Sequence, residues 1–149
     1  MNSLATAAGA GRHGPRLQDP WSTSAQPASS RFENQWHFSH AVAARGLLLL
    51  SGVTGTSVEG VVPSDPAEQF EQAFVHLGLY LQAAGASLGD VVELNSYHVD
   101  LRQHLDAFMA AKDRHLVAPY PAWSAIGVSQ LITEGALVEI RAIAVDPRE

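Results

Sequence analysis

The chain has 149 residues, of which 46% are hydrophobic, and this length suits one ordinary domain with its own core. It has no cysteine, which excludes disulfides, thiolate metal sites and a cysteine nucleophile, and its formal charge of −6 with a single lysine argues against broad binding of nucleic acid. Without an apolar run near the roughly 20 residues of a membrane span, and without a secretory signal pattern, we expect a cytoplasmic protein with no membrane partner.

Residues 1–30 are rich in Ala, Gly, Ser and Pro and show no apolar period. They predict a flexible arm in front of a folded domain at residues 31–149. Residues 35–42 and 47–52 predict two strands, joined by a hairpin turn at Arg45-Gly46. The second strand is apolar without alternation, which suits a strand covered on both faces.

A helix is predicted after the glycine- and serine-rich loop at residues 55–65. Asp65 suits the N-cap, Pro66 the first helical position, and Glu68 the third position of a capping box. Gly85 suits a left-handed helix end. The apolar stripe at helical spacing comprises Phe70, Phe74, Leu77 and Leu81.

The remaining elements complete an α+β pattern. Residues 90–99 predict a strand and residues 101–117 a second helix, with Leu101, Leu105, Phe108 and Leu116 facing inward. Residues 121–129 and 136–145 predict the last two strands. The order β-β-α-β-α-β-β predicts a mixed sheet with two helices on one face.

The last predicted strand has two different faces. One carries small apolar side chains suited to packing under helices: Ala136, Val138, Ile140, Ala142 and Ala144. The other carries Leu137, Glu139, Arg141, Ile143 and Val145. Three of these five residues are large and apolar, which does not suit a face exposed to water, so we expect another subunit to cover this face. The two charges then need partners, because an unpaired buried charge is costly.

Several segments together resemble the RidA/YjgF family. They are FSHAVAARGLLLLSG, AAGASLGDVVELNSYHVD, PAWSAIGVSQL and VEIRAIAV, which run from about Phe38 to Val145. The resemblance implies a chorismate-mutase-like α+β subunit and a homotrimer. In such a trimer three sheets form a central barrel, the helices lie outside, and small-molecule clefts open at the subunit interfaces. We expect no cofactor and no metal.

Enzymatic members of this family hydrolyse reactive enamines and imines, such as 2-aminoacrylate, to the 2-keto acid and ammonia. Their key residue is an arginine in a Pro-Ala-Arg-Ser segment, whose planar fork can grip a substrate carboxylate. Here the segment is Pro121-Ala122-Trp123-Ser124, and tryptophan carries no charge. The resemblance therefore points to a divergent branch of the family, in which Trp123 replaces the arginine.

Other site positions of the family are partly kept. Its usual first-strand tyrosine corresponds to Phe38, and its asparagine in the second helix corresponds to Ala110. Ser51 and Gly52, which line the pocket in the family, are present. Glu139 is present too, at the position proposed to orient or activate the attacking water.

Three residues each have two interpretations. Glu139 is a general base or water-orienting carboxylate, or else an interface carboxylate paired with Arg141 or a neighbouring subunit. Trp123 is a pocket wall and stacking platform, or it fills the space left by the arginine. Arg141 is a guanidinium for an acidic ligand, or part of an inter-subunit salt bridge.

The remaining polar candidates carry weaker signals. His37 and His40 fall on opposite faces of a strand and lack a third ligand, so a zinc site is not expected. His40 neighbours the pocket and is an acid–base group or a partly exposed polar residue. Ser51 lies in no nucleophile motif and is expected to offer a hydroxyl or a nearby backbone N–H to a ligand, with Ser124 also beside the pocket. His76 and His98 are interpreted as structural or surface residues.

Three functions follow from these residues. The first is a hydrolase, with Glu139 handling water for deamination of a small imine and Trp123 shaping the pocket. The second is a non-catalytic trimer that binds a small metabolite in the same clefts. The third, an endoribonuclease activity attributed to parts of the family, is disfavoured by the negative charge and by the absence of a basic-aromatic stripe.

Overall fold

The computed structural model describes residues 16–17, 36–57 and 59–149. Its strands are β1 (Arg16–Leu17), β2 (Ala41–Ala44), β3 (Leu47–Leu50), β4 (Val53–Thr54), β5 (Val91–His98), β6 (Ala122–Gly127) and β7 (Val138–Val145). Its helices are α2 (Pro66–Ala83), α3 (Leu101–His115) and the short 3₁₀ helix η1 (Leu88–Asp90). The predicted flexible arm at 1–30 lies outside the described residues, except for β1, which pairs with β2.

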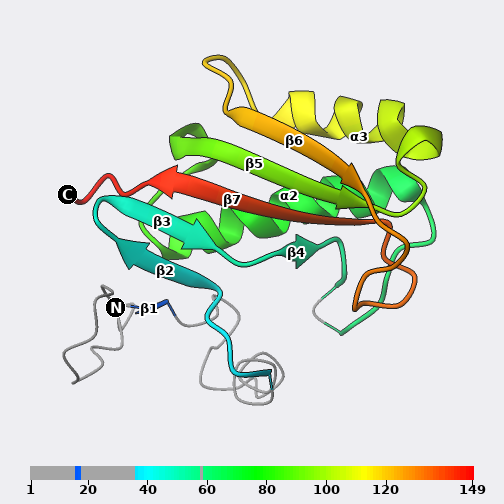
Figure 1. Cartoon of the computed structure of the whole chain (residues 1–149), viewed down its shortest axis with the longest axis horizontal. Coiled ribbons are helices and arrows are strands. Elements are labelled where there is room, and N and C mark those ends of the chain that lie inside the picture. The colour runs from blue at the N-terminus through cyan, green and yellow to red at the C-terminus, as the bar shows by residue number, and fades with distance from the viewer. Residues whose placement is uncertain (1–15, 18–35, 58) are drawn as a thin grey trace.

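The strands form one mixed sheet in the order β1-β2-β3-β7-β5-β6, with β4 paired to β7. β5 and β6 are parallel, whereas the other neighbours are antiparallel. Figure 1 shows both long helices on the same side of this sheet. The predicted α+β architecture is therefore confirmed, with β1 and β4 as strands that the sequence pattern did not indicate.

The hairpin between β2 and β3 is confirmed at the predicted residues. Ala44 pairs with Leu47, which leaves Arg45 and Gly46 as the two-residue turn. Both have positive φ, 51° and 71°, as a type I′ turn requires. This turn has the twist that matches the flanking strands and so fixes their register.

β2 begins at Ala41, later than the predicted start at residue 35. His37 has a φ of 54°, which is incompatible with a continuous strand, and the carbonyl of Ser39 accepts a hydrogen bond from the Ser51 hydroxyl. The segment before β2 is therefore not a continuous strand, and hydrogen bonds from Ser51 to the carbonyls of Ser39 and His40 hold it beside β3.

Helix α2 forms at the predicted place, although the hydrogen bonds described at its start do not include the predicted capping box with Glu68. The Asp65 side chain accepts a hydrogen bond from the Ala67 N–H at 3.3 Å, Pro66 is the first helical residue, and Gly85 follows the helix with a φ of 84°. The predicted stripe is fully buried and forms much of the core with α3 and the sheet. The largest members of this core are Phe70, Phe74, Leu77, Leu81, Phe108, Leu48, Leu50, Leu94 and Ile140.

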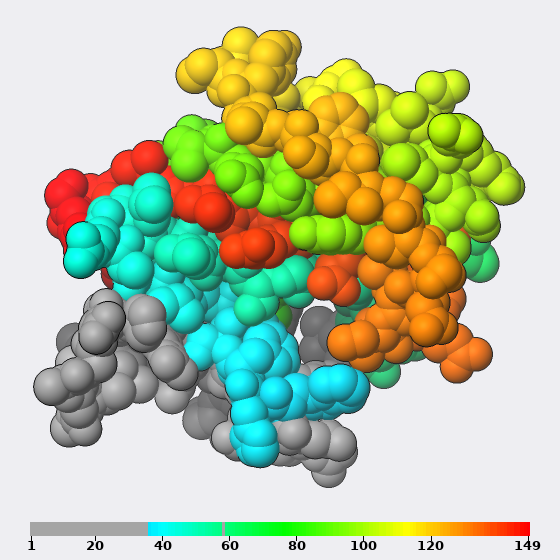
Figure 2. Space-filling model, in the orientation of Figure 1, coloured from blue at the N-terminus to red at the C-terminus, as the bar shows by residue number. Residues whose placement is uncertain are grey.

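The two faces of the sheet are covered differently. On β7 the residues Val138, Ile140, Ala142 and Ala144 are buried under the helices. The alternate residues Glu139, Arg141 and Ile143 are half-buried, and Val145 is exposed. Figure 2 shows this second face, over which no described helix lies. Among the described helices, none is long and apolar enough to cross a membrane.

Candidate functional site

Glu139 lies on the helix-free face of the sheet, in a row with residues of two neighbouring strands. Tyr97 of β5 is its partner on one side and Thr54 of β4 on the other. The Glu139 side chain packs directly against Gly52, where an added Cβ would overlap the carboxylate. Gly52 therefore leaves the space in which this carboxylate sits.

The Glu139 carboxylate has no hydrogen-bond or ion-pair partner among the residues that the structure describes. Among the described residues it forms neither a hydrogen bond nor an ion pair, and Arg141, two residues along the same face, does not pair with it. Burial raises the pKa of Glu139, because removal from water disfavours the charged carboxylate. The interpretation that Glu139 pairs with Arg141 of its own chain is therefore not met, while pairing with another subunit stays a prediction.

Ser51 joins β3 to the segment in front of β2. Its N–H donates to the carbonyl of His40 at 2.9 Å, and its hydroxyl donates to the carbonyl of Ser39 at 2.6 Å. The hydroxyl and the backbone N–H of Ser51, which were expected to be available to a ligand, thus donate to carbonyl groups of the same chain. The hydroxyl oxygen of Ser51 still has the capacity to accept a hydrogen bond.

Phe38 and His40 are held beside Ser51 by ring contacts. The His40 ring stacks on Tyr80 of α2 with centroids 4.6 Å apart, and Phe38 meets His40 edge to face at 5.0 Å. The structure therefore links five predicted residues through consecutive contacts. We call them the Glu139 cluster: Phe38, His40, Ser51, Gly52 and Glu139.

Trp123 lies on the other face of the sheet. In β6 it pairs with the buried Leu94 and so points toward the helices. Its indole Nε1–H donates to the Ser96 hydroxyl at 2.9 Å, and its ring stacks on Phe108 with centroids 6.0 Å apart. The Lys112 ammonium lies 5.0 Å from the ring centroid. Within one chain the indole fills the space between β6 and α3.

Ser124 and Arg141 lie on the helix-free face together. Asn95 of β5 pairs with Ser124 on one side and Arg141 on the other, so the three form one cross-strand row. The Asn95 amide donates to Glu93 at 2.6 Å, and no described residue forms an ion pair with Arg141. One chain therefore brings Arg141 and Ser124 to the face of Glu139, but not Trp123.

The two histidines expected to be structural or surface residues differ in burial, since His98 is buried and His76 is half-buried. His98 is 1% exposed and packs against Phe108 and Phe70, with ring centroids 4.5 Å and 6.5 Å away. Burial lowers its pKa to about 4. His76 hydrogen-bonds through Nδ1 to the carbonyl of Thr54 at 2.8 Å. In the described parts of the chain no three metal-binding side chains gather at one point.

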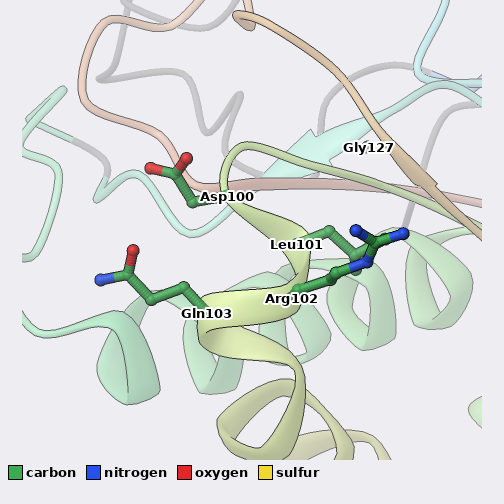
Figure 3. A pocket seen from close by; sticks show the side chains of 5 residues that line it. All are labelled: Asp100, Leu101, Arg102, Gln103 and Gly127. Carbon is green, nitrogen blue, oxygen red and sulfur yellow. The ribbon is translucent and has the colours of Figure 1, made fainter.

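A cavity of about 430 Å³ opens where α3 begins and β6 ends. Figure 3 shows its lining, which consists of Asp100, Leu101, Arg102, Gln103 and Gly127. Most of these side chains are exposed, and none belongs to the Glu139 cluster. The sequence did not indicate this cavity, and it did not indicate Tyr97 and Thr54 beside Glu139, because strand register is not visible in local patterns.

Comparisons with known proteins agree with this geometry. Residues 28–146 match the family model described as Endoribonuclease L-PSP. The chain is 34% identical to the RutC family protein YjgH of Escherichia coli K12 over 75% of this chain and 85% of that protein. It is 33% identical to a 2-iminobutanoate/2-iminopropanoate deaminase of Dermatophagoides farinae, over 72% of this chain and 84% of that one.

Solved structures show the same fold. A structure described as protein YJGH superposes with a TM-score of 0.72 at 31% identity, covering 78% of this chain and 89% of that chain. The mixed sheet with two helices on one face is thus the chorismate-mutase-like subunit that the resemblance implied. The family match, the curated relatives and the shared fold lead to one conclusion: the chain belongs to the RidA/YjgF family.

Proposed function

We propose that this protein is a deaminase-type hydrolase of small 2-imino acids. The observation that carries the proposal is Glu139, a half-buried carboxylate that packs against Gly52 and has no partner in the described part of its chain. A relative of known name, the 2-iminobutanoate/2-iminopropanoate deaminase, supports the substrate class.

The chemistry needs only water and one carboxylate that can move a proton. Glu139 accepts a proton from water as the oxygen adds to the C=N carbon, which gives a carbinolamine. That proton passes to the imine nitrogen. Glu139 then moves the hydroxyl proton of the carbinolamine to its amino group, the C–N bond breaks as the C=O bond forms, and ammonia leaves with a 2-keto acid. A pKa raised by burial suits this role, because it makes the carboxylate a stronger base and brings its titration nearer to neutral pH.

The site is proposed to form between subunits of a homotrimer. Glu139 and Trp123 are on opposite faces of one sheet, with β5 between their strands. They can therefore line one cleft only when they come from different copies. The uncovered face with Ile143 and Val145, and the position of β6 at the sheet edge, support such an assembly.

A non-catalytic binding protein is the second candidate. Its supporting observation is Trp123, whose only donor is engaged by Ser96 and which therefore offers a ligand an apolar ring. The correspondence of Trp123 with the family arginine stays a prediction. On the second proposal the clefts hold a small metabolite without hydrolysing it. The chain's formal charge of −6 disfavours the endoribonuclease activity.

The proposal is tested by generating 2-iminopropanoate in situ and measuring the rate at which ammonia is released. We expect wild type to accelerate hydrolysis and Glu139→Gln to lower kcat/KM about 100-fold, the usual scale for a lost acid–base group. Glu134→Gln, which removes an exposed loop carboxylate, is the matched control and should keep full activity. Wild type that binds pyruvate without turnover would favour the second candidate.

Subunit mixing tests the composite cleft. Light scattering should first give about three times 15.9 kDa, and a monomer would contradict the trimer. Glu139→Gln and Trp123→Ala, each impaired alone, should regain activity when refolded together. Random mixing leaves both halves intact in about one quarter of the clefts. No recovery, or full activity of Trp123→Ala alone, would remove Trp123 from the site.

A further inference from the structure

Arg141 lies two residues from Glu139 on the helix-free face of β7. Successive residues of a strand point to opposite faces, so side chains at this spacing share a face and begin about 7 Å apart along the strand. Both side chains are half-buried. A small molecule that contacts the Glu139 carboxylate is therefore within reach of the Arg141 guanidinium.

Arg141 is a half-buried cation that has no ion pair in the described part of the chain. Lys112, Arg114 and Arg148, in contrast, each pair with a carboxylate, at distances of 2.8, 2.8 and 2.6 Å. A charge that is partly removed from water is costly unless an opposite charge or hydrogen bonds compensate it. The Arg141 guanidinium therefore suits an anion that comes from outside its own chain.

The polar neighbours of Arg141 on β5 are engaged with each other. Asn95, which is opposite Arg141 in the sheet, donates its amide to the Glu93 carboxylate at 2.6 Å. Glu93 itself is opposite Ile143, one step further along the same face. The acidic side chain on the neighbouring strand is thus held by Asn95, and the guanidinium is left for another acceptor.

A 2-imino acid carries a carboxylate bonded directly to the carbon that water attacks. Beside an ionised Glu139 this second carboxylate is disfavoured, because like charges in one site repel each other. A guanidinium offsets the repulsion and can hold a carboxylate through two parallel hydrogen bonds. Trp123, the other proposed wall of the cleft, carries no charge. The cation that the substrate needs is therefore supplied from the strand of Glu139.

We infer that Arg141 binds the carboxylate of the ligand. It thereby selects acids whose carboxylate is bonded directly to the reacting carbon over neutral imines and over acids with a longer spacer. The inference rests on the proposed site at Glu139 and adds the group that recognises the substrate. In it Arg141 contacts the ligand and moves no proton, which remains the task of Glu139.

Binding of three carbonyl compounds tests the inference without requiring turnover. They are pyruvate, its neutral amide pyruvamide, and levulinate, in which a spacer separates the carboxylate from the carbonyl. Calorimetry on the full-length protein should show pyruvate binding about 10-fold more tightly than the other two. Arg141→Gln should weaken pyruvate about 10- to 100-fold, the scale of lost hydrogen bonds to a charged group, and pyruvamide less than about 2-fold. Arg102→Gln, which removes an exposed arginine of α3, is the matched control and should change neither.

A second variant separates ligand binding from a contact between subunits. Arg141→Lys keeps the cation but loses the planar fork, so its affinity for pyruvate should lie between those of wild type and Arg141→Gln. Light scattering of the three proteins should give the same molar mass. If Arg141→Gln changes the molar mass, or weakens pyruvate and pyruvamide equally, the guanidinium is an inter-subunit contact and the inference is wrong.

The outcomes distinguish this inference from the proposed function. Hydrolysis of 2-iminopropanoate by wild type, with KM and pyruvate affinity unchanged in Arg141→Gln, would overturn only the role of Arg141. Pyruvate binding that depends on Arg141, without any turnover, would support that role and contradict the hydrolase. If wild type binds pyruvate no more tightly than pyruvamide, or binds neither, the role of Arg141 is overturned.

Discussion

The two faces of the sheet differ in packing and in the partners of their polar side chains, although the same strands form both. On β5 and β7 the helix side is closed by aromatic and aliphatic packing, and its polar groups, such as Ser96 and His98, are enclosed. The opposite side carries Glu139 and Arg141, half-buried and without partners in the described chain. The helix face thus stabilises the subunit through packing. The opposite face carries partly buried charged groups without described partners, which is typical of a surface that binds another subunit or a ligand.

A matched pair of substitutions on β7 gives the largest expected contrast. Ile140→Ala on the helix face should lower the free energy of unfolding by about 2–5 kcal/mol, because it leaves a cavity in a packed core. Ile143→Ala on the open face should cost less than about 1 kcal/mol in an isolated subunit. Urea denaturation at several protein concentrations measures both.

Denaturation at several protein concentrations shows whether other copies of the chain cover the open face. If other copies cover the open face, the loss for Ile143→Ala should appear as a weaker association, and its midpoint should depend on protein concentration more steeply than that of wild type. Equal losses for the two variants in a monomer would show that the faces do not differ as the structure indicates.

The second contrast is the pH dependence from His98. Burial holds its pKa at about 4 against an ordinary 6.5, so the unfolded chain binds the proton more readily than the folded chain. The stability is therefore complete above pH 6.5 and is lost as pH falls from 6.5 toward 4. The gap between these values, at about 1.4 kcal/mol for each pKa unit, sets a ceiling of roughly 3 to 4 kcal/mol.

Replacing the ring isolates this effect from other titrations. His98→Leu should flatten the loss of stability between pH 6.5 and 4 relative to wild type, measured as the difference of the two urea curves at each pH. The packing lost with the ring shifts the whole curve and does not change its slope. Parallel curves for the two proteins would mean that His98 is protonated in the folded state as readily as in the unfolded chain.

The sequence allowed much of the helix face to be predicted, because that face depends on local patterns. The α2 stripe, the Asp65 cap, the Gly85 end and the turn at Arg45 all act over a few residues, and each was found where expected. The alternation of β7 likewise showed which residues meet the helices. Local propensity and local packing agree throughout these elements.

The site was less predictable because it depends on pairing between distant segments. Alternation in β6 shows that Trp123 and Ser124 face opposite ways, but both faces of this edge strand carry small residues, so the pattern does not say which side the indole takes. The helix side follows from the parallel register with Leu94. The row of Tyr97 and Thr54 beside Glu139 depends on register in the same way.

The third contrast is between two substitutions of Trp123, to Arg and to Phe, and it tests whether the indole packs on the helix face of the sheet. Trp123→Arg should cost about 2–3 kcal/mol, since it removes the hydrogen bond to Ser96 and the stacking on Phe108 and brings a second cation to Lys112. Trp123→Phe should keep most of the packing and lose about 1 kcal/mol. A stable Trp123→Arg protein would mean that the indole is not fixed between β6 and α3.

The smallest expected effect belongs to Glu139 and has the opposite sign. Its pKa is raised by burial, so the folded chain binds the proton more readily than the unfolded chain, and ionisation at neutral pH weakens the fold. Glu139→Gln should therefore raise the free energy of unfolding at pH 7 by about 0.5 kcal/mol. The gain should vanish as pH falls through the titration of the carboxyl group. A substitution that stabilises the subunit but lowers turnover would show that Glu139 is retained for its chemistry. A loss of stability would instead show that Glu139 already has a partner in the assembly.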